Sequence, residues 1–377
     1  MSRLLLDVMG GDYAPKAILD GALASLKDLH LPLVLIGDEK QIRKHAIGKM
    51  IGEGPSAKVS LLHAPENIEM EDKIKAIRSK PNAPINVGTR LVAESWKAMH
   101  AVQRDPPASG PGHAVQRTTP ASDRDGPDAF VSAGHSGAVM ASALLTLGRL
   151  KGIERPAIAT RLPTLNGKGV VCLDVGANVD CKPEHLRDFA IMGAFSAASA
   201  HGGGTLPKVA ILANGEERTK GNDLTRAACA ILEGHPLFAG GKESGAIADF
   251  VGYCEAKEMF KGSVDVAVMD GMVGNLILKN SEAVASLLIK LMAGEAKRNP
   301  LNLIGFGIAY GALRALKKKV DFRETGAAPL LGVQGYVFIA HGRSDKVAVR
   351  NSLIRAQESL DAKTIERLEK AVAPGAD

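Results

Sequence analysis

The chain has 377 residues, of which 45% are hydrophobic and 23% charged, as in globular proteins large enough for two domains or for one large sheet with an added lobe. Only 4% are aromatic, which argues against a nucleic-acid partner, because single strands are usually bound by stacking on aromatic side chains. The net charge of +6 favours anionic partners, namely phosphate, an acidic protein or a membrane surface.

The cysteines and the apolar runs indicate the compartment. Cys172, Cys181, Cys229 and Cys254 form no CxxC motif, so reduced thiols are expected rather than disulfides or a zinc site. No signal peptide is expected before the first strand, and no apolar run is long enough to cross a bilayer. The sequence therefore predicts a cytoplasmic protein.

The first predicted unit is a strand at residues 4–8, a turn with paired glycines, and a helix at residues 16–29. Gly10 and Gly11 would let the backbone approach a ligand closely and leave N–H groups facing an anion at the helix start. A tight structural turn explains these glycines equally well, and the pattern is not the GxGxxG dinucleotide fingerprint.

Strands are predicted next at residues 33–36 and 59–62, followed by clustered charges of both signs at residues 69–80. Such a run is usually a solvated helix face. The alternative is a mobile lid that supplies Lys73, Arg78 or Lys80 to an anionic substrate.

A helix is predicted at residues 86–99, and a tandem duplication follows it. The sequence His-Ala-Val-Gln-Arg at residues 100–104 recurs at 113–117, within a segment rich in Pro, Gly, Ser and Asp. This composition buries too little apolar surface to order itself. An exposed, mobile insertion without a catalytic role is therefore predicted at residues 101–126.

Regular structure resumes with a strand at residues 128–132, a turn, and a helix at residues 139–147. In the turn, Ser136 is predicted to cap the helix. His135 is a candidate acid, base or hydrogen-bond donor to a carbonyl, although a lone histidine in a turn is more often simply exposed.

The central motif is the turn at residues 174–182, between a buried strand at 169–173 and a helix at 187–200 whose first turn carries Pro183. Asp174 and Asn178 stand where ligands bind in open α/β sheets, at the carboxyl end of a strand. The alternative is a polar turn with a good helix cap.

Two later turns have the same character. After a strand at residues 209–212, Lys220-Gly221-Asn222 is a second candidate anion cradle. After a strand at residues 264–269, Asp270 could orient a cation or hold a metal, but no second carboxylate stands beside it, so no metal is predicted. A long helix is expected at residues 276–297.

Residues 301–313 carry no charge and are flanked by Lys and Arg on both sides. They are too short to cross a bilayer of about 30 Å, but they could dock on an anionic surface. A buried helix pair or a dimer contact is the alternative. The candidate docking side chains are apolar: Leu301, Leu303, Ile304 and Phe306.

The chain ends with strands near residues 329–333 and 336–340, a turn at His341, and a helix at residues 346–372. Because strands alternate with helices throughout, a layered α/β/α fold with a mostly parallel sheet is predicted, with a protruding helical hairpin at 276–319. No activated nucleophile and no P-loop is found.

Taken together, the turns resemble those of the bacterial phosphate acyltransferases of phospholipid synthesis. The matching stretches follow in order: 6–12, 70–73, 131–134, 173–181, 215–221, 270–275, and 330–332 with 341–342. One departure is His135-Ser136, where the family usually has Asn-Thr after Ser-Ala-Gly.

The resemblance implies a single acyltransferase domain over residues 1–377 in which inorganic phosphate attacks the thioester of acyl-acyl-carrier protein. It also implies a fold like that of phosphotransacetylases and isocitrate or isopropylmalate dehydrogenases. No cofactor is implied. The expected partners are the acyl-acyl-carrier protein, phosphate, a second copy in a homodimer, an anionic membrane surface to which the cytoplasmic protein binds peripherally, and the downstream glycerol-3-phosphate acyltransferase.

The matched strand ends give two sets of candidate residues. The candidates for catalysis are His135, Ser136, Asp174, Asn178, Lys220 and Asp270. The candidates for substrate binding are Asp7, Gly10, Gly11, Asp12, Lys73, Arg78, Lys182, Asn214, Gly221, Asn222, Gly271, Gly274, Asn275 and His341. Phosphate is expected on Lys220, Asn222, Asn178 and the amides of Gly10 and Gly11, with Asp174 and Asp270 orienting the cations.

Two other functions remain open. A dehydrogenase of the related fold should show a ribose-binding signature and a metal-binding carboxylate cluster, and the sequence shows neither. A non-catalytic scaffold for carrier protein and membrane would not need so many polar strand-end turns.

Overall fold

The computed structural model describes residues 1–54, 57–104, 126–200, 205–238 and 245–373. The chain divides into two compact units, one made of residues 1–156 with 326–377 and the other of residues 157–325. The acyltransferase domain expected over the whole chain stays a prediction, and each unit is described by itself.

The first unit contains a parallel sheet to which one antiparallel strand is added. Its strands are β1 (Leu4–Asp7), β2 (Leu33–Gly37), β3 (Val59–His63), β4 (Ala129–Ser132), β11 (Ala328–Leu331) and β12 (Tyr336–Ile339). They lie in the order β3-β2-β1-β4-β12-β11, and only β11 runs antiparallel to its neighbour β12. Every residue of β1 is buried because the strand is central and flanked on both sides.

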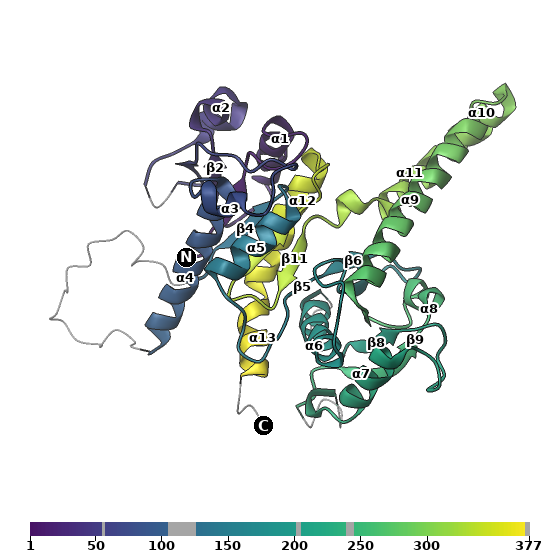
Figure 1. Cartoon of the computed structure of the whole chain (residues 1–377). Coiled ribbons are helices and arrows are strands. Elements are labelled where there is room, and N and C mark those ends of the chain that lie inside the picture. The colour runs from purple at the N-terminus through teal and green to yellow at the C-terminus, as the bar shows by residue number, and fades with distance from the viewer. Residues whose placement is uncertain (55–56, 105–125, 201–204, 239–244, 374–377) are drawn as a thin grey trace. The chain divides into compact units, whose positions relative to one another are not determined.

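The helices of the first unit are α1 (Lys16–Ser25), α2 (Glu39–Lys44), α3 (Ala76–Ser79), α4 (Pro84–Arg104), α5 (Ser136–Thr146), α12 (Lys346–Asp361) and α13 (Thr364–Val372). The connections through α1 and α4 run in opposite directions across the sheet, so right-handed crossovers place these helices on opposite faces. Helices α1 and α12 pack together, as do α4 and α5 (Figure 1). The unit is therefore a layered α/β/α structure, as predicted.

Several element boundaries differ from the sequence prediction. Helix α4 continues to Arg104, four residues into the predicted insertion, whose residues 105–125 lie outside the described ones. The charged run at 69–80 holds only the short α3. The last predicted helix is divided into α12 and α13, because Lys363 takes a left-handed conformation with φ 49°.

The second unit has its own sheet in the order β6-β7-β10-β8-β9, parallel except for β6. The strands of this sheet are β6 (Thr160–Leu162), β7 (Val170–Leu173), β8 (Lys208–Leu212), β9 (Asp249–Cys254) and β10 (Val266–Val268). The unit begins with the short strand β5 (Ala157–Ile158), which is not part of this sheet. Its helices are α6 (Pro183–Ala200), α7 (Asp223–Glu233), α8 (Ala256–Lys261), α9 (Gly271–Ala296), α10 (Pro300–Ile308) and α11 (Tyr310–Val320). Helix α6 packs against β7, β8 and β10.

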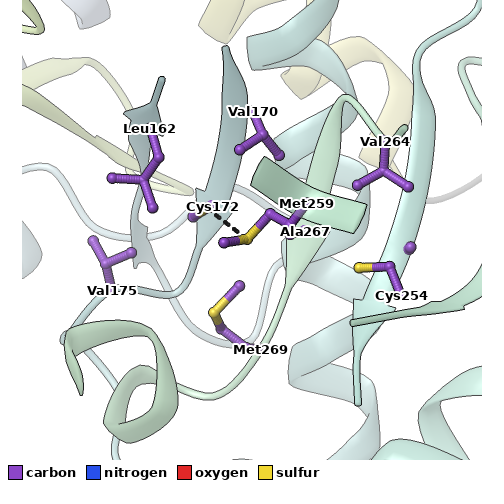
Figure 2. Packing of buried hydrophobic residues seen from close by; sticks show 10 residues of the cluster. Leu162, Val170, Cys172, Val175, Cys254, Met259, Val264, Ala267 and Met269 are labelled. Atoms are coloured by element: carbon purple, nitrogen blue, oxygen red, sulfur yellow. Dashed lines mark hydrogen bonds between the residues drawn. The ribbon is translucent and has the colours of Figure 1, made fainter. Parts of the chain in front are cut away.

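One face of this sheet is closed by a sulfur-rich apolar cluster (Figure 2). The Sγ atom of Cys172 lies 3.7 Å from Sδ of Met259, and Cys254 and Met269 belong to the same cluster. Burial raises the pKa of the Cys254 thiol to about 12 and that of Cys172 further still. All four cysteines are free, and these two serve as packing groups because the reactive thiolate is disfavoured.

The hairpin predicted at residues 276–319 appears as α9 to α11. Figure 1 shows α9 extending away from the sheet of its own unit, with α10 at its far end. Helix α10 folds back on α9, where the Asn302 Nδ2 group donates to the Glu295 carbonyl at 2.9 Å. Among the described residues, no helix combines the length and apolar character that a membrane span requires.

Candidate functional site

In the first unit, Asp7 links the turns that follow β1 and β4. Its Oδ1 accepts the N–H groups of Met9 and Gly10 at 2.9 and 3.0 Å, and its Oδ2 accepts the Ser132 hydroxyl at 2.7 Å. The Ser132 Oγ in turn accepts the N–H of Gly134 at 3.0 Å. Ser132 was not among the predicted site residues, although its position as the last residue of β4 was the available signal.

The glycine pair at residues 10–11 is shaped by this network. A Cβ on Gly10 would stand 2.6 Å from Asp7 Oδ2 and 2.6 Å from the Gly134 nitrogen, so close packing requires the glycine. Gly11 has φ +105°, and the following Asp12 donates its N–H to the Gly342 carbonyl at 2.8 Å. Because Gly10 already gives its N–H to Asp7, it does not leave that group free for an anion, in contrast to the prediction.

Burial raises the pKa of the Asp7 carboxyl from 3.8 to about 6, although its hydrogen bonds to Ser132, Met9 and Gly10 act to lower it. The folded protein therefore holds this proton more tightly than the unfolded chain. The stability that this group contributes is fully present below pH 3.8 and is lost as the pH rises through about 6.

Asp7→Asn removes this ionisation, because asparagine keeps a carbonyl for the two amides and offers N–H to the Ser132 oxygen. The variant should gain unfolding free energy relative to the wild type as the pH rises from about 4 to about 7, by about 3 kcal/mol in total. Denaturant titrations of both proteins across that range measure the difference. A difference that does not vary with pH would contradict the assignment.

The turn after β4 carries His135, which caps helix α5. The Ala138 N–H donates to the imidazole Nδ1 at 3.2 Å, so the predicted cap at Ser136 is wrong and Ser136 is instead the first helical residue. An Nδ1 that accepts leaves the proton of a neutral ring on Nε2. His135 therefore has an N–H available to donate, which is the role predicted for it.

The charged segment at residues 70–80 lies against these turns. Its Lys80 Nζ is 2.6 Å from Asp72 Oδ2 and donates to the Asn67 carbonyl, so it is held in place. Lys73 and Arg78 are exposed. On the neighbouring turn, His341 is exposed and accepts the N–H of Arg343 at its Nδ1.

In the second unit, Asp174 at the end of β7 organises the central motif. Its two oxygens accept the N–H groups of Ile158, Gly176, Ala177 and Asn178 and the side-chain amide of Asn178, at 2.6–3.3 Å. Burial raises the pKa of this carboxyl, and these hydrogen bonds oppose the rise. A single side chain thus holds the turn at residues 174–178.

The start of α9 packs directly on this turn. A Cβ on Gly271 would lie 2.7 Å from Asp174 Oδ2, and a Cβ on Gly274 would overlap the Asp174 carbonyl oxygen. The Gly271 N–H donates to the Asn178 carbonyl at 2.8 Å. Asn275 lies beside Gly176. The two glycines therefore allow helix and turn to meet without a side chain between them.

The two carboxylates that were expected to orient cations instead accept hydrogen bonds from backbone N–H groups. Asp270 caps α9, accepting the N–H of Val273 at 2.9 Å. Neither Asp270 nor Asp174 forms an ion pair in the part of the chain that the structure describes. Both organise backbone, so the expected role as cation holders is not what this geometry supports.

The predicted anion cradle at residues 220–222 is also built differently. Gly221 gives its N–H to Asn214 Oδ1 at 3.0 Å, and Asn222 gives its N–H to Thr225 while its own Oδ1 caps α7. The backbone N–H groups of Gly221 and Asn222 therefore already have hydrogen-bond acceptors. The groups still available are the ammonium of the half-buried Lys220 and the side-chain NH2 groups of Asn214 and Asn222.

Lys182 is exposed and donates its N–H to the Nδ1 of His185 at 3.1 Å. This buried histidine was not a predicted candidate, and only its place in the first turn of α6 could have indicated it.

The candidate residues thus form two groups, one in each unit. The first unit holds Asp7, Gly10, Gly11, Asp12, Lys73, Arg78, His135, Ser136 and His341. The second holds Asp174, Asn178, Lys182, Asn214, Lys220, Gly221, Asn222, Asp270, Gly271, Gly274 and Asn275. Within the described ranges, no group of three or more His, Cys, Asp or Glu residues could hold a metal ion.

Comparison with known proteins gives one consistent result. A family model described as fatty acid synthesis protein matches residues 2–103 and 108–367. A phosphate acyltransferase of Pelotomaculum thermopropionicum is 42% identical over 372 residues, covering 98% of this chain and 95% of the relative. A phosphate acyltransferase of Nitratiruptor sp. is 36% identical over 380 residues, covering 100% of both.

A solved structure agrees at the level of the fold. The branched-chain phosphotransacylase from Enterococcus faecalis V583 superposes with a TM-score of 0.52 at 11% identity, covering 96% of this chain and 99% of that one. The expected layered α/β fold with mostly parallel sheets is confirmed. With the full-length sequence matches, these findings show that the chain belongs to the family of the phosphate acyltransferases.

Proposed function

We propose that this protein transfers an acyl group from the thioester of an acyl-acyl-carrier protein to inorganic phosphate. The observation that carries the proposal is the match, over 98% of the chain, to a relative named phosphate acyltransferase. The products would be an acyl phosphate and the free carrier thiol. Feeding of glycerol-3-phosphate acylation and a homodimeric state stay predictions.

The reaction does not require a nucleophilic side chain. An oxygen of HPO4²⁻ attacks the thioester carbonyl, the new C–O bond forms, the C–S bond breaks, and the proton of phosphate passes to the leaving thiolate. Because phosphate is itself the nucleophile, catalysis consists mainly of positioning and of stabilising the oxyanion that develops.

The residues best suited to these tasks are those whose donors remain available. Lys220 supplies a positive charge, and the side-chain NH2 groups of Asn214 and Asn222 beside it supply neutral donors for phosphate oxygens. The Nε2–H of His135 is suited to the thioester oxygen. Asp7 and Asp174 act indirectly, by holding the turns that carry these groups.

Release of the carrier thiol from palmitoyl-acyl-carrier protein, with and without phosphate, tests the proposal. We expect release that depends on phosphate, with acyl phosphate trapped as a hydroxamate by hydroxylamine. Lys220→Ala should raise the phosphate KM by about tenfold, since a charged hydrogen bond is removed. Release that does not depend on phosphate would indicate thioester hydrolysis and contradict the proposal. No release at all over a range of chain lengths would favour the scaffold function.

We also propose that the tip of the hairpin docks on an anionic membrane surface. The apolar side chains of α10 and of the start of α11 are largely exposed, with Leu301 at 80% and Ile308 at 84%. Of the other predicted docking residues, Leu303 and Ile304 are also exposed, whereas Phe306 is half-buried. Exposed cations follow in α11, at Lys317, Lys318 and Lys319, where they would meet lipid phosphates.

Sedimentation with vesicles of phosphatidylglycerol and phosphatidylethanolamine measures this docking. The double variant Leu303→Glu/Ile308→Glu should bind about tenfold more weakly, because charge is costly in the apolar layer. The matched control is Leu165→Glu, an exposed leucine (88%) of the same unit outside the hairpin, which should bind as the wild type does. Equal binding by the hairpin variant would remove this segment as the anchor.

A further inference from the structure

Seven residues of the segment 72–80 in the first unit line an open hollow of about 690 Å³. Three of the lining side chains, Lys73, Lys75 and Arg78, are exposed cations. In the described part of the chain they have no ion pair and no side-chain hydrogen bond. We call the surface formed by the lining residues the cationic hollow: Asp72, Lys73, Lys75, Ala76, Arg78, Ser79 and Lys80.

The acidic group of the hollow, the Asp72 carboxylate, is already paired with a lysine. Asp72 is held by Lys80, with 2.6 Å between Oδ2 and Nζ, and this hydrogen bond lowers the pKa of the Asp72 carboxyl. The carboxylate therefore stays ionised together with its ammonium partner. The net charge that the hollow presents comes from the other three cations.

An apolar residue, Ile74, lies between two of these cations in the sequence. Ile74 is 52% exposed, and its Cδ1 lies 3.5 Å from the position that a Cβ on Gly137 would take. The same Cβ position is 3.1 Å from Cε1 of His135. The hollow therefore adjoins the turn whose imidazole carries the available Nε2–H.

We propose that the cationic hollow is the docking surface for an acidic carrier protein, which places the thioester arm beside the His135 turn. This inference rests on the proposed function and names the surface that takes the macromolecular substrate. Three exposed cations on the same short segment as an exposed isoleucine match a protein face that carries several carboxylates beside a small apolar area. A phosphate ion is a poorer match, because the cations are spread over an open hollow far larger than that ion.

The charge-reversing variant Lys75→Glu tests the surface. We expect its KM for palmitoyl-acyl-carrier protein to rise about tenfold, with the phosphate KM and kcat unchanged. The small thioester S-palmitoyl-pantetheine should be turned over as by the wild type. Binding of dye-labelled holo-acyl-carrier protein should weaken by the same factor, and raising the salt from about 0.05 M to about 0.5 M should weaken the wild type far more than the variant.

Matched variants separate docking from general effects of charge and folding. Lys27→Glu, an exposed lysine of the same unit just after α1, should bind the carrier as the wild type does. The neutral variant Lys75→Gln should lose affinity in the same direction but to a smaller extent. The charge-preserving variant Lys75→Arg should retain it.

The outcomes for the two proposals are distinct. If the wild type shows phosphate-dependent turnover but Lys75→Glu binds the carrier normally, the docking inference is wrong and the proposed function stands. A raised phosphate KM with normal carrier binding would also overturn it, since the hollow would then bind phosphate. If carrier binding depends on the hollow but no turnover is seen, the docking inference stands and the proposed acyltransferase function is wrong.

Discussion

Gly274→Ala is expected to lower the free energy of unfolding by about 3 kcal/mol and to abolish most of the acyl-transfer activity. The added methyl group would overlap the backbone carbonyl oxygen of Asp174, and neither backbone can move without disturbing the turn at residues 174–178. The start of α9 would therefore have to shift away from the central motif. Circular dichroism during denaturant unfolding measures the stability, and thiol release measures the activity.

A second glycine on α9 provides the control. Gly294 has no atom within 4 Å of the position that its Cβ would take, so Gly294→Ala adds only helix propensity. This variant should be more stable by about 0.8 kcal/mol, with activity unchanged. If the two substitutions behaved alike, the contact of Gly274 with the Asp174 turn would not be the cause of the loss.

Asp174→Ala should have a larger effect on stability, because five N–H groups lose their acceptor at once. Partly buried donors left unpaired cost about 1 kcal/mol each, so a total loss of about 5 kcal/mol is expected. Asp174→Asn retains one carbonyl oxygen and should lie between alanine and the wild type. The order aspartate, asparagine, alanine in unfolding free energy is the result to measure.

The control for this series lies in the same turn. Asp180 is exposed, and Asp180→Ala should change the unfolding free energy by less than about 0.5 kcal/mol. Equal losses at Asp174 and Asp180 would mean that loss of charge, and not loss of the acceptor, destabilises the turn.

Much of the fold could be predicted because its strands are short apolar runs that end at glycine-containing turns. Leu4–Asp7 and Val170–Leu173 are buried at every residue, and apart from Asp7 at the end of the first strand all of these residues are apolar. Strand β9 was missed because it is an edge strand with alternating exposure and a left-handed glycine, Gly252, that breaks the pattern. The division at Lys363 could not be predicted, since its neighbours continue the helical periodicity.

The positions of the candidate residues at strand ends were predicted from the sequence, but their hydrogen bonds were not. Strand-end location suggested Asp7 and Asp174, and both lie at strand ends. The partners of their oxygens are backbone amides that only the folded turns bring together. For the same reason the free amides expected at Gly10 and Gly221 proved to be occupied, by side chains three and seven residues away. The catalytic and binding roles of all these residues stay predictions.

The division of the chain also fixes an order of events on the ribosome. The second unit is a continuous segment, residues 157–325, whereas the first needs residues 326–377 to be complete. Strand β12 pairs directly with β4, so the hydrogen-bonding edge of β4 stays open until residues 336–339 have been synthesised. An open edge of this kind is a template for wrong pairing. The nascent first unit therefore exposes such an edge during synthesis, whereas the five strands of the second unit's own sheet lie within one continuous segment.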